Sequence, residues 1–200
     1  MQHLHQRNIV LGSTSVYRRE LLARLRLPFT VEPSHVDELP LPGESPAVLA
    51  RRLALSKANV VAKLHPKSVF IGCDQVADLH GTALGKPGNF ERAMAQLQLM
   101  RGQTVLFQTA VAVVCLESGF CEQVLVSVAV KFRSLSDVEI AHYLHLEEPY
   151  DCAGSAKSEG LGIALLESIE SDDPTTLIGL PLIRTSAMLR SAGITLLGAP

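Results

Sequence analysis

The sequence predicts one α/β domain built on a mixed β-sheet with flanking helices. Short apolar runs of strand length alternate with helical segments along the 200 residues, which is typical of an α/β fold. Two long apolar runs, 105–115 and 124–132, are separated by a turn at 117–119, so we expect an antiparallel hairpin that makes the sheet mixed. Hydrophobic residues make up 47% of the chain, enough for one sizeable core, and no linker or repeat interrupts it. Residues 1–200 are therefore expected to form a single domain.

The first half of the chain is expected to hold three strands and two helices. Ser15 ends a Gly/Ser turn and can cap a helix over about 16–25. Ser45 followed by Pro46 is a typical helix start, and this helix is expected to reach about Leu64. The apolar stripe expected on it comprises Leu49, Leu53, Val60 and Leu64. The strands are expected at 8–11, 29–31 and 68–73, the last ending abruptly at Asp74.

The second half is expected to hold the long hairpin together with three helices and a short strand. Ser136 and Glu139 are spaced as a capping box, so a helix is expected from Ser136 to about Leu144. Gly193 is expected to end the last helix. The other expected elements are a turn at 80–81, a helix over 90–100, a strand over 163–166 and the last helix over 182–191.

Composition argues against several classes of function. The chain has no run of about 18 apolar residues, so no membrane span and no membrane partner are expected. The N-terminal segment is polar and the apolar run 9–11 is too short for a signal peptide, which favours a cytoplasmic protein. A formal net charge of −2 argues against binding of a nucleic-acid polymer through bulk positive charge. The four cysteines lack CxxC spacing and are expected to be free thiols.

The turn at 12–15 and the helix after it carry the residues of an anion site. Arg18 and Arg19 lie in the first helical turn, where a cation opposes the helix macrodipole. Free N–H groups, hydroxyl groups such as that of Ser13 and two guanidinium groups would converge there. The alternative is a solvated basic face. The GxxxxGK[ST] pattern of a P-loop is absent from the chain.

Three other residues interrupt the pattern of the elements that carry them. Lys57 falls at the edge of an apolar stripe, where it either extends to solvent or points into a pocket. Asp74 follows an apolar strand, where a carboxylate can be a base, a Mg²⁺ ligand or only a turn residue. Lys86 lies on a turn that the next proline makes rigid. The aspartate pair at 172–173, also followed by proline, is either a metal site or a common turn.

Together these residues form the set that a polyphosphate requires. Four cations and two carboxylates fall where elements are expected to begin or end: Arg18, Arg19, Lys57, Lys86, Glu38 and Asp74. Fixed positive charges bind phosphates, and carboxylates hold Mg²⁺ and orient water. The glycine-rich segment 152–162 carries Lys157 and Glu159 on a nearly bare backbone, so it is either a linker or a wall that a flat ligand can approach.

The order of these motifs resembles that of the Maf family of nucleotide pyrophosphatases, also called septum-formation inhibitor proteins. The matching segments span nearly the whole chain and are highly specific in combination. They are Ser13-Thr14-Ser15-Val16-Tyr17-Arg18-Arg19, Val36-Asp37-Glu38, Lys57-Ala58, Gly72-Cys73-Asp74-Gln75-Val76, Gly85-Lys86-Pro87, and the segments 152–160 and 173–181. Val16 departs from the proline common in the family, which removes a rigid helix start but leaves the chemistry in place.

The resemblance implies hydrolysis between the α and β phosphates of a nucleoside triphosphate with a divalent cation, Mg²⁺ or Mn²⁺. It implies an elongated mixed sheet with a central cleft, similar to that of inosine triphosphate pyrophosphatases, and it allows for a homodimer. Asp74 matches the family's proton acceptor, and Glu38 matches a carboxylate that helps with metal or water, so both are candidate metal ligands. The phosphate-binding positions fall on Ser13, Arg18, Arg19, Lys57 and Lys86.

Within the family, Asp74-Gln75 and the segment 157–160 resemble the branch that acts on 7-methyl-GTP. Other branches carry Asp-Thr in place of Asp-Gln and act on dTTP, UTP or CTP. N7-methylation makes guanine cationic and strengthens stacking on an electron-rich ring. Tyr17 either supplies that ring or only packs at its helix start, while Glu159 could accept from the guanine N1–H and amino group. Base specificity is thus expected from Tyr17, Gln75, Lys157 and Glu159.

Two alternatives stay open on sequence alone. One is the same hydrolysis acting on another nucleotide, such as dTTP, UTP, CTP, unmodified GTP or another modified nucleotide. The other is a nucleotide-binding regulator of cell division with little catalysis. The presence of Asp74 among the candidate catalytic residues argues against a pure binder, which has no need of a base.

Overall fold

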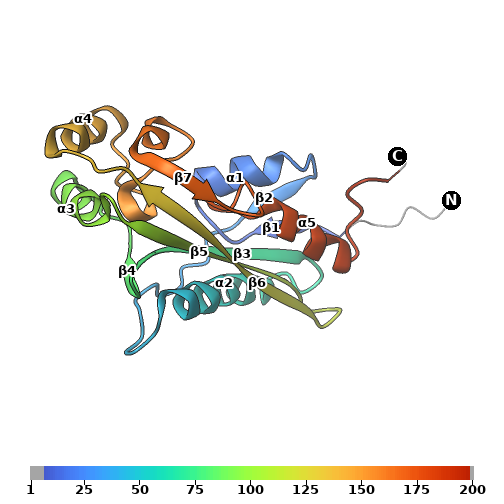
Figure 1. The fold of residues 1–200 in the computed structure, drawn as a ribbon. Helices are drawn as coiled ribbons and strands as arrows, with labels where there is room; N and C mark the ends of the chain where they lie inside the picture. Colours follow the sequence, from blue (N-terminus) through green and yellow to red (C-terminus); the bar gives the residue numbers. More distant parts are fainter. Residues whose placement is uncertain (1–6, 199–200) are drawn as a thin grey trace.

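The computed structural model describes residues 7–198, which form a seven-stranded mixed sheet covered by helices (Figure 1). The strand order is β2-β1-β3-β5-β6-β7, with β4 paired to the far end of β3. The first three of these strands are parallel, and the others pair antiparallel. The strands are β1 (Ile9–Leu11), β2 (Phe29–Val31), β3 (Val69–Leu79), β4 (Thr82–Leu84), β5 (Thr104–Cys115), β6 (Phe120–Phe132) and β7 (Leu166–Glu170). The α-helices are α1 (Val16–Ala23), α2 (Pro46–Ala62), α3 (Phe90–Met100), α4 (Asp137–Glu147) and α5 (Leu182–Ser191).

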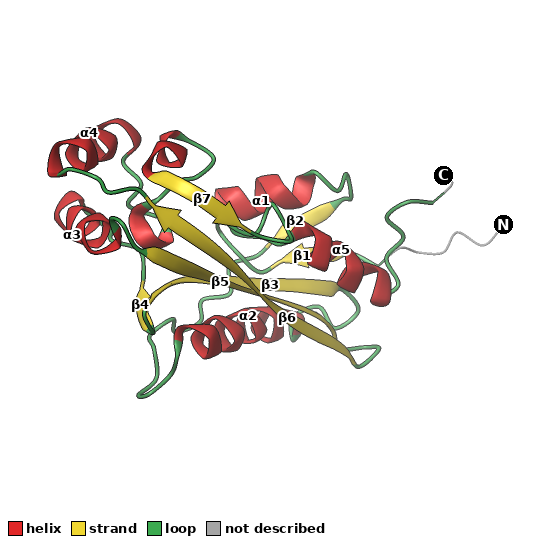
Figure 2. Cartoon of the chain, viewed as in Figure 1, coloured by secondary structure: helices red, strands yellow, loops and turns green. Residues whose placement is uncertain are grey.

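Helices cover both faces of the sheet because its central strands are apolar on both sides. α2 packs on one face, where Phe70 of β3 and Ala112 of β5 belong to its cluster. α1 and α5 pack on the opposite face, with Leu22 and Leu189 in one cluster with Ile71. α3 and α4 lie side by side at the end of the hairpin and enclose a third cluster (Figure 2). These three clusters hold α1, α2 and α4 in place around β3.

The expected fold class and most element starts are confirmed. Ser15, Ser45 and Ser136 each accept a hydrogen bond from the backbone N–H three residues further on, as N-caps do. Ser136 and Glu139 form the complete capping box. Gly193 follows α5 with a φ of +87°, a conformation that favours glycine. Within residues 7–198, no helix has the length and apolar character needed to cross a bilayer.

The expectation that a strand ends at Asp74 is wrong. β3 continues to Leu79, and Asp74 pairs with Ala110 of β5 inside an unbroken antiparallel ladder. The expected strand at 163–166 is also wrong, because residues Leu161–Leu165 form a 3-10 turn and β7 starts only at Leu166. β6 begins at Phe120, earlier than expected, and α1 ends two residues sooner. In a sequence, an ionisable residue inside a strand is easily taken for the end of the strand, because the partner that neutralises it lies on another element.

The apolar stripe expected on α2 is only half right. Leu49 and Leu53 are buried, but Val60 and Leu64 are 45% and 68% exposed. The buried face is instead lined by small residues and by the aliphatic stem of Lys57. The small buried residues are Ala50, Ala54, Ala58 and Ala62. A face of alanines lets the helix approach the sheet closely, which brings Lys57 over β3.

The sheet has a gap in one edge, and the gap determines where a ligand can bind. β1 pairs with β3 only as far as Ile71, and β4 pairs with the same edge of β3 only from Ala77 onward. Residues 72–76 of β3 therefore have no strand beside them on that edge. The chain leaves the carboxyl end of β1 at this point and turns into α1. A strand end does lie beside Asp74, but it is the end of β1, and crevices at such ends are the usual ligand sites of α/β sheets.

Gly72 is the position where α2 approaches β3 most closely, and we predict that Gly72→Ala destabilises the protein. A Cβ at Gly72 would lie 2.1 Å from the Ala54 carbonyl oxygen and 2.5 Å from the Ala58 nitrogen, both backbone atoms that cannot turn aside. The helix must shift, at a cost of about 3 kcal/mol in the free energy of unfolding. Urea unfolding measures this loss. Gly85→Ala is the matched control, since Gly85 has no heavy atom within 4 Å of a built Cβ. Equal midpoints for the two variants would contradict the close contact.

Candidate active site

A cleft of about 880 Å³ opens beside the gap in the edge of β3. Ligand pockets commonly have volumes of this order, so a nucleotide fits. Asp74, Gln75 and Val76 of β3 line it where no strand covers their edge. The remaining lining comes from the start of α1 with the turn before it, the loop that contains Glu38, the buried face of α2, the turn after β4, and the segments 151–159 and 177–179. The fold thus brings the sequence motifs together at the cleft, and only those residues of a motif that face outward lie outside the lining.

The turn between β1 and α1 holds Arg18 near the carboxyl end of β1. The Ser15 side chain accepts the Arg18 N–H at 3.4 Å and starts the helix. The guanidinium Nε donates to the Gly179 carbonyl at 3.1 Å, and Nη1 lies 3.5 Å from the Ser13 hydroxyl oxygen. Ser13 is itself buried, and its oxygen also accepts the Ser15 N–H at 3.2 Å. Arg18 and Ser13 are therefore pre-oriented on the cleft, as an anion site requires.

Lys57 lies between two carboxylates at the centre of the cleft. Its Nζ is 2.6 Å from Asp74 Oδ1 and 2.7 Å from Glu38 Oε1. The Lys57 and Asp74 side chains are 6% and 8% exposed, whereas that of Glu38 is 56% exposed. Sequence alone left open whether Lys57 extends to solvent; it points into the cleft. The three groups form a charged triad with a net charge of −1. Lys57 comes from α2, Asp74 from β3 and Glu38 from a loop.

Glu38 remains ionised because of its cationic surroundings. Burial alone would raise its pKa, but the hydrogen bond from Lys57 and the charges of Lys57, Lys86 and Arg18 together hold the pKa below its ordinary value. The loop that carries it is fastened by Arg52, whose guanidinium grips Glu44 at 2.7 and 2.8 Å and also donates to the Leu39 carbonyl. This bidentate pair lowers the pKa of Glu44 to about 2 and fixes the chain next to Glu38.

The other two predicted phosphate-binding cations are placed differently. Lys86 is exposed on the turn after β4 and lines the cleft, close enough for its charge to act on Glu38. Arg19 is exposed on α1 and does not belong to the lining. Adjacent helical residues point about 100° apart, so α1 can aim only one of its two arginines into the cleft. The structure selects Arg18.

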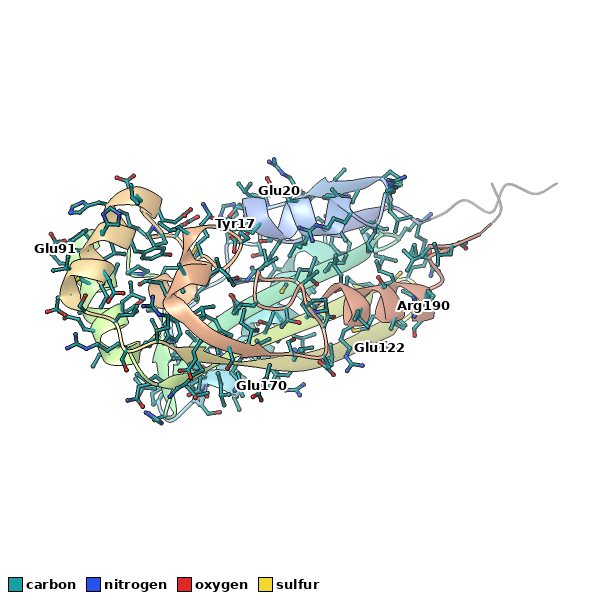
Figure 3. All side chains as sticks on the ribbon, turned by 45° about the horizontal axis from the view of Figure 1, so that its top comes forward. Tyr17, Glu20, Glu91, Glu122, Glu170 and Arg190 are labelled. Carbon is teal, nitrogen blue, oxygen red and sulfur yellow. The ribbon has the colours of Figure 1, made fainter. Side chains whose placement is uncertain are left out.

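Tyr17, Cys152 and Glu159 meet at the other end of the cleft. Figure 3 shows Tyr17 at the end of α1 that faces the pale orange ribbon of the segment after α4, whereas Glu20 lies on the outer side of the helix. Cys152 Sγ is 3.8 Å from the Tyr17 hydroxyl, and Asp151 and Glu159 also line this end. Burial, reinforced by Cys152 and the two carboxylates, raises the pKa of Tyr17, so its ring is a neutral phenol. Lys157 Nζ lies over one face of the ring, 6.0 Å from its centroid, so a base that stacks on Tyr17 would use the other face.

The pKa values of the Cys152 thiol and the Glu159 carboxyl group, both near Tyr17, are also raised. Burial, and then the charge of Asp151, raises the pKa of Cys152 to about 12, so the group is a neutral thiol and not a nucleophile. Partial burial raises the pKa of Glu159 above its ordinary value, although Lys157 acts in the opposite direction. The lining near Tyr17 thus contains the carboxyl groups of Asp151 and Glu159 and a neutral thiol, whereas the ammonium of Lys157 lies outside the lining.

Gln75 is aimed away from Asp74, on the opposite face of β3. Its Nε2 donates to the Thr109 hydroxyl at 2.9 Å and to the carbonyls of Thr176 and Leu177 at 3.0 and 3.2 Å. An amide nitrogen has only two hydrogens, so these acceptors use its whole donor capacity. Gln75 lines the cleft but can only accept a hydrogen bond there, through Oε1. This narrows the expected role of Gln75 as a reader of the base.

Lys157 is near the cleft but not in its lining. Its Nζ forms a 2.8 Å salt bridge with Glu147, the last residue of α4, and lies 6.0 Å from the centroid of the Tyr17 ring. Sequence reasoning placed Lys157 among the base-contacting residues and did not single out Glu147. A glutamate at the end of a surface helix gives no sequence signal of its own, because the partner that explains it lies ten residues further on.

The aspartates at 172–173 form a structural cap, which decides between the two readings left open by the sequence. Asp173 is fully buried, and its Oδ2 accepts the N–H groups of Ile183 and Arg184 at 2.8 and 3.2 Å at the start of α5. Asp172 pairs with Arg184 on the surface. Oδ1 of Asp173 accepts from Thr175. This cap shapes the loop whose Gly179 carbonyl holds Arg18, so the segment acts on the cleft through its backbone.

A divalent cation would have two protein ligands in this cleft. Within residues 7–198, no group of three or more His, Cys, Asp or Glu side chains is placed to hold a metal ion by itself. Glu38 and Asp74, however, are drawn to one point by Lys57. Mg²⁺ is commonly bound by one or two carboxylates, with substrate phosphates and water completing its shell. The donor set therefore fits a cation that arrives with a polyphosphate.

The fold and the cleft together define an α/β protein whose cleft presents clustered cations in one part and carboxyl groups beside an aromatic ring in another. The chain belongs to the Maf family, since the family model described as Maf-like protein matches residues 8–192.

Relatives with assigned names cover almost the whole chain. A protein of Polaromonas sp. (strain JS666 / ATCC BAA-500) named 7-methyl-GTP pyrophosphatase is 67% identical over 95% of this chain and 87% of its own length. A protein of Albidiferax ferrireducens with the same name is 64% identical over 97% of this chain and 98% of its own. Among solved structures, a nucleoside-triphosphatase / dITP/XTP pyrophosphatase from Mycobacterium abscessus is a distant likeness, 15% identical over 93% of this chain and 97% of its own, with a TM-score of 0.46.

Proposed function

We propose that this protein hydrolyses the α–β phosphoanhydride of 7-methyl-GTP to 7-methyl-GMP and pyrophosphate. The observation that carries the proposal is the division of charge along the cleft. Arg18, Lys57 and Lys86 outnumber the carboxylates Glu38 and Asp74 in one part of it, whereas Asp151 and Glu159 line the end beside Tyr17. A triphosphate joined to a cationic base has the same division of charge, so both of its ends are complemented. Relatives 54 to 67% identical bear the name 7-methyl-GTP pyrophosphatase, which supports the same activity here.

Asp74 is the group that we propose accepts the proton of the attacking water. Lys57 donates to its Oδ1 and fixes the carboxylate, while Oδ2 accepts no hydrogen bond from the described residues and Asp74 lines the cleft. A base fixed in this way can orient water for attack on the α-phosphorus. Arg18, Lys57 and Lys86 would then stabilise the charge that develops on the pyrophosphate as it leaves.

Glu38 and Asp74 are the residues that we propose hold a divalent cation, Mg²⁺ or Mn²⁺. Such an ion would neutralise phosphate charge and polarise the phosphoryl group. The low pKa of Glu38 supports this role, because the carboxylate remains ionised and able to ligate. The four cysteines are free thiols, which supports placing the activity in the reducing cytoplasm.

Base selection is proposed to depend on Tyr17 and Glu159, with Gln75 as an acceptor. A cationic 7-methylguanine stacks more strongly on the Tyr17 ring than a neutral base does. Glu159 would accept from its N1–H and amino group, a pair of donors that uracil and thymine lack. Gln75 Oε1 is left to accept one further donor, since its amide nitrogen is engaged with the loop 176–177.

A panel of triphosphates tests the proposal. We expect kcat/KM for 7-methyl-GTP to exceed that for GTP at least about tenfold, the effect of one cation–π contact with a carboxylate beside it. The panel comprises 7-methyl-GTP, GTP, dTTP, UTP and CTP, with pyrophosphate release as the assay. A clear preference for dTTP, UTP or CTP would replace the methylated substrate by another base. Tight binding of nucleotide without product over hours would instead favour a regulator with little catalysis.

A further inference from the structure

The Glu147 carboxylate is not part of the cleft lining, but it contacts the turn that carries Glu159. The part of the cleft lined by Tyr17 and Glu159 is called the base end here. Glu147 ends α4, and its side chain is only 16% exposed. Oε1 accepts from Lys157 Nζ and Oε2 accepts the Leu161 N–H, both at 2.8 Å. Its two oxygens therefore hold both sides of the turn that carries Glu159. The hydrogen bonds from Lys157 and Leu161 hold the pKa of Glu147 below its ordinary value, which keeps it ionised.

The turn is shaped to receive this carboxylate. A Cβ at Gly160 would lie 2.8 Å from both Glu147 carboxylate oxygens, so a side chain there would expel them. A Cβ at Gly162 would lie 2.5 Å from the Lys157 carbonyl oxygen, so the turn can fold back on itself only with glycine. The Tyr143 hydroxyl accepts the Lys157 N–H at 3.0 Å and fastens the same turn to α4. Glu147 is thus the charged centre around which the turn is packed.

Lys157 lies where its charge matters for a cationic base. Its Nζ is 6.0 Å from the centroid of the Tyr17 ring, the ring proposed to stack the base. Its charge also acts on Glu159, the carboxylate proposed to accept from the base. Without a partner, this ammonium would repel a cationic base and compete for both of its binding groups. The 2.8 Å bond to Glu147 holds the ammonium outside the cleft lining and balances its charge.

We propose that Glu147 is a positioning residue for base selectivity: by pairing with Lys157 it holds that ammonium outside the cleft lining and balances its charge beside Tyr17 and Glu159, and so leaves the base end of the cleft negative for a cationic base. The inference rests on the proposed function, since it concerns how that site distinguishes 7-methyl-GTP from GTP. It assigns Lys157 a different role from the one expected from sequence, because Lys157 is to be kept away from the base and does not read it.

Glu147→Gln tests the electrostatic part of this role. The amide keeps the size of the side chain and an oxygen that can accept the Leu161 N–H, but it removes the charge that balances Lys157. We expect the ratio of kcat/KM for 7-methyl-GTP over GTP to fall about tenfold, as one unbalanced charge about 6 Å away in a half-solvated site would cause. Most of the fall should lie in KM for 7-methyl-GTP. A thermal melt confirms that the variant is folded.

The double variant Glu147→Gln/Lys157→Met separates charge balance from scaffolding. Removal of the ammonium should restore the ratio to near the wild-type value, and Lys157→Met alone should keep or raise it. If Glu147 only supports the turn, the double variant will be no better than Glu147→Gln, and that result overturns the inference. An unchanged ratio in Glu147→Gln overturns it as well, while leaving the proposed function intact. A wild-type protein that does not prefer 7-methyl-GTP removes the proposed function and this inference together.

Discussion

Asp74→Asn is expected to lower kcat for 7-methyl-GTP by about a thousandfold or more while leaving KM within a few-fold. General-base catalysis contributes about 10²–10⁴ to the rate of such steps, and an amide cannot take the proton of the attacking water. The fold should survive, because asparagine can still accept from Lys57 and Lys57 remains 2.7 Å from Glu38. Single-turnover measurement of pyrophosphate release isolates the chemical step.

Asp78→Asn is the matched control for this variant. Asp78 lies on the same strand, four residues beyond Asp74 and outside the cleft lining, where its Oδ1 accepts the Gly81 N–H at 2.7 Å. An asparagine keeps that acceptor, so turnover should be close to wild type. If Asp74→Asn kept full turnover, Asp74 would not be the base, and Glu38 would be the next carboxylate to test.

Lys57→Met is expected to abolish turnover and to destabilise the protein at the same time. Removing one partner of a buried ion pair leaves the other charge uncompensated, and the Asp74 side chain is only 8% exposed. The loss in the free energy of unfolding should be about 3 kcal/mol, the low end for such changes, because water can reach Asp74 through the cleft. Lys63→Met, at an exposed position that caps the same helix, should cost little and leave activity in place.

The pH dependence of this destabilisation has a defined sign. Lys57 is the main reason that the pKa of Glu38 lies below its ordinary value of 4.5 despite partial burial. A lowered pKa contributes stability that is fully present above the unfolded pKa and is lost as the pH falls through the folded pKa. The difference between wild type and Lys57→Met should therefore be full at neutral pH and shrink below about pH 4.5 as Glu38 becomes protonated. A difference that grew towards low pH would contradict the ion-pair account.

Local signals were the part of the fold that sequence could predict. The N-caps Ser15, Ser45 and Ser136 depend on residues within three positions, so their helices begin where expected. The unbroken β3 could not be predicted in the same way. A carboxylate in mid-strand is tolerable only because Lys57 reaches it from α2, and that contact depends on Gly72 admitting the helix backbone.

The candidate site was predicted unevenly for the same reason. The residue types predicted a polyphosphate ligand, because cations and carboxylates together indicate such a ligand even when their positions in the fold are unknown. Direction was not predictable, since Arg18 and Arg19 have the same side chain and only Arg18 lines the cleft. Glu147 carried no signal, because its meaning comes from two bonds to a turn that sequence showed only as glycine-rich. Pairings of this kind are set by tertiary packing and not by local pattern.

Hydrolysis of 7-methyl-GTP in ¹⁸O-labelled water tests the central claim most directly. Attack of water on the α-phosphorus, oriented by Asp74, places one ¹⁸O atom in 7-methyl-GMP and none in pyrophosphate. Mass spectrometry of the two products after a single turnover distinguishes the outcomes, and Asp74→Asn serves as the blank. We predict label in 7-methyl-GMP alone. Label in pyrophosphate, or release of orthophosphate with 7-methyl-GDP, would contradict the account.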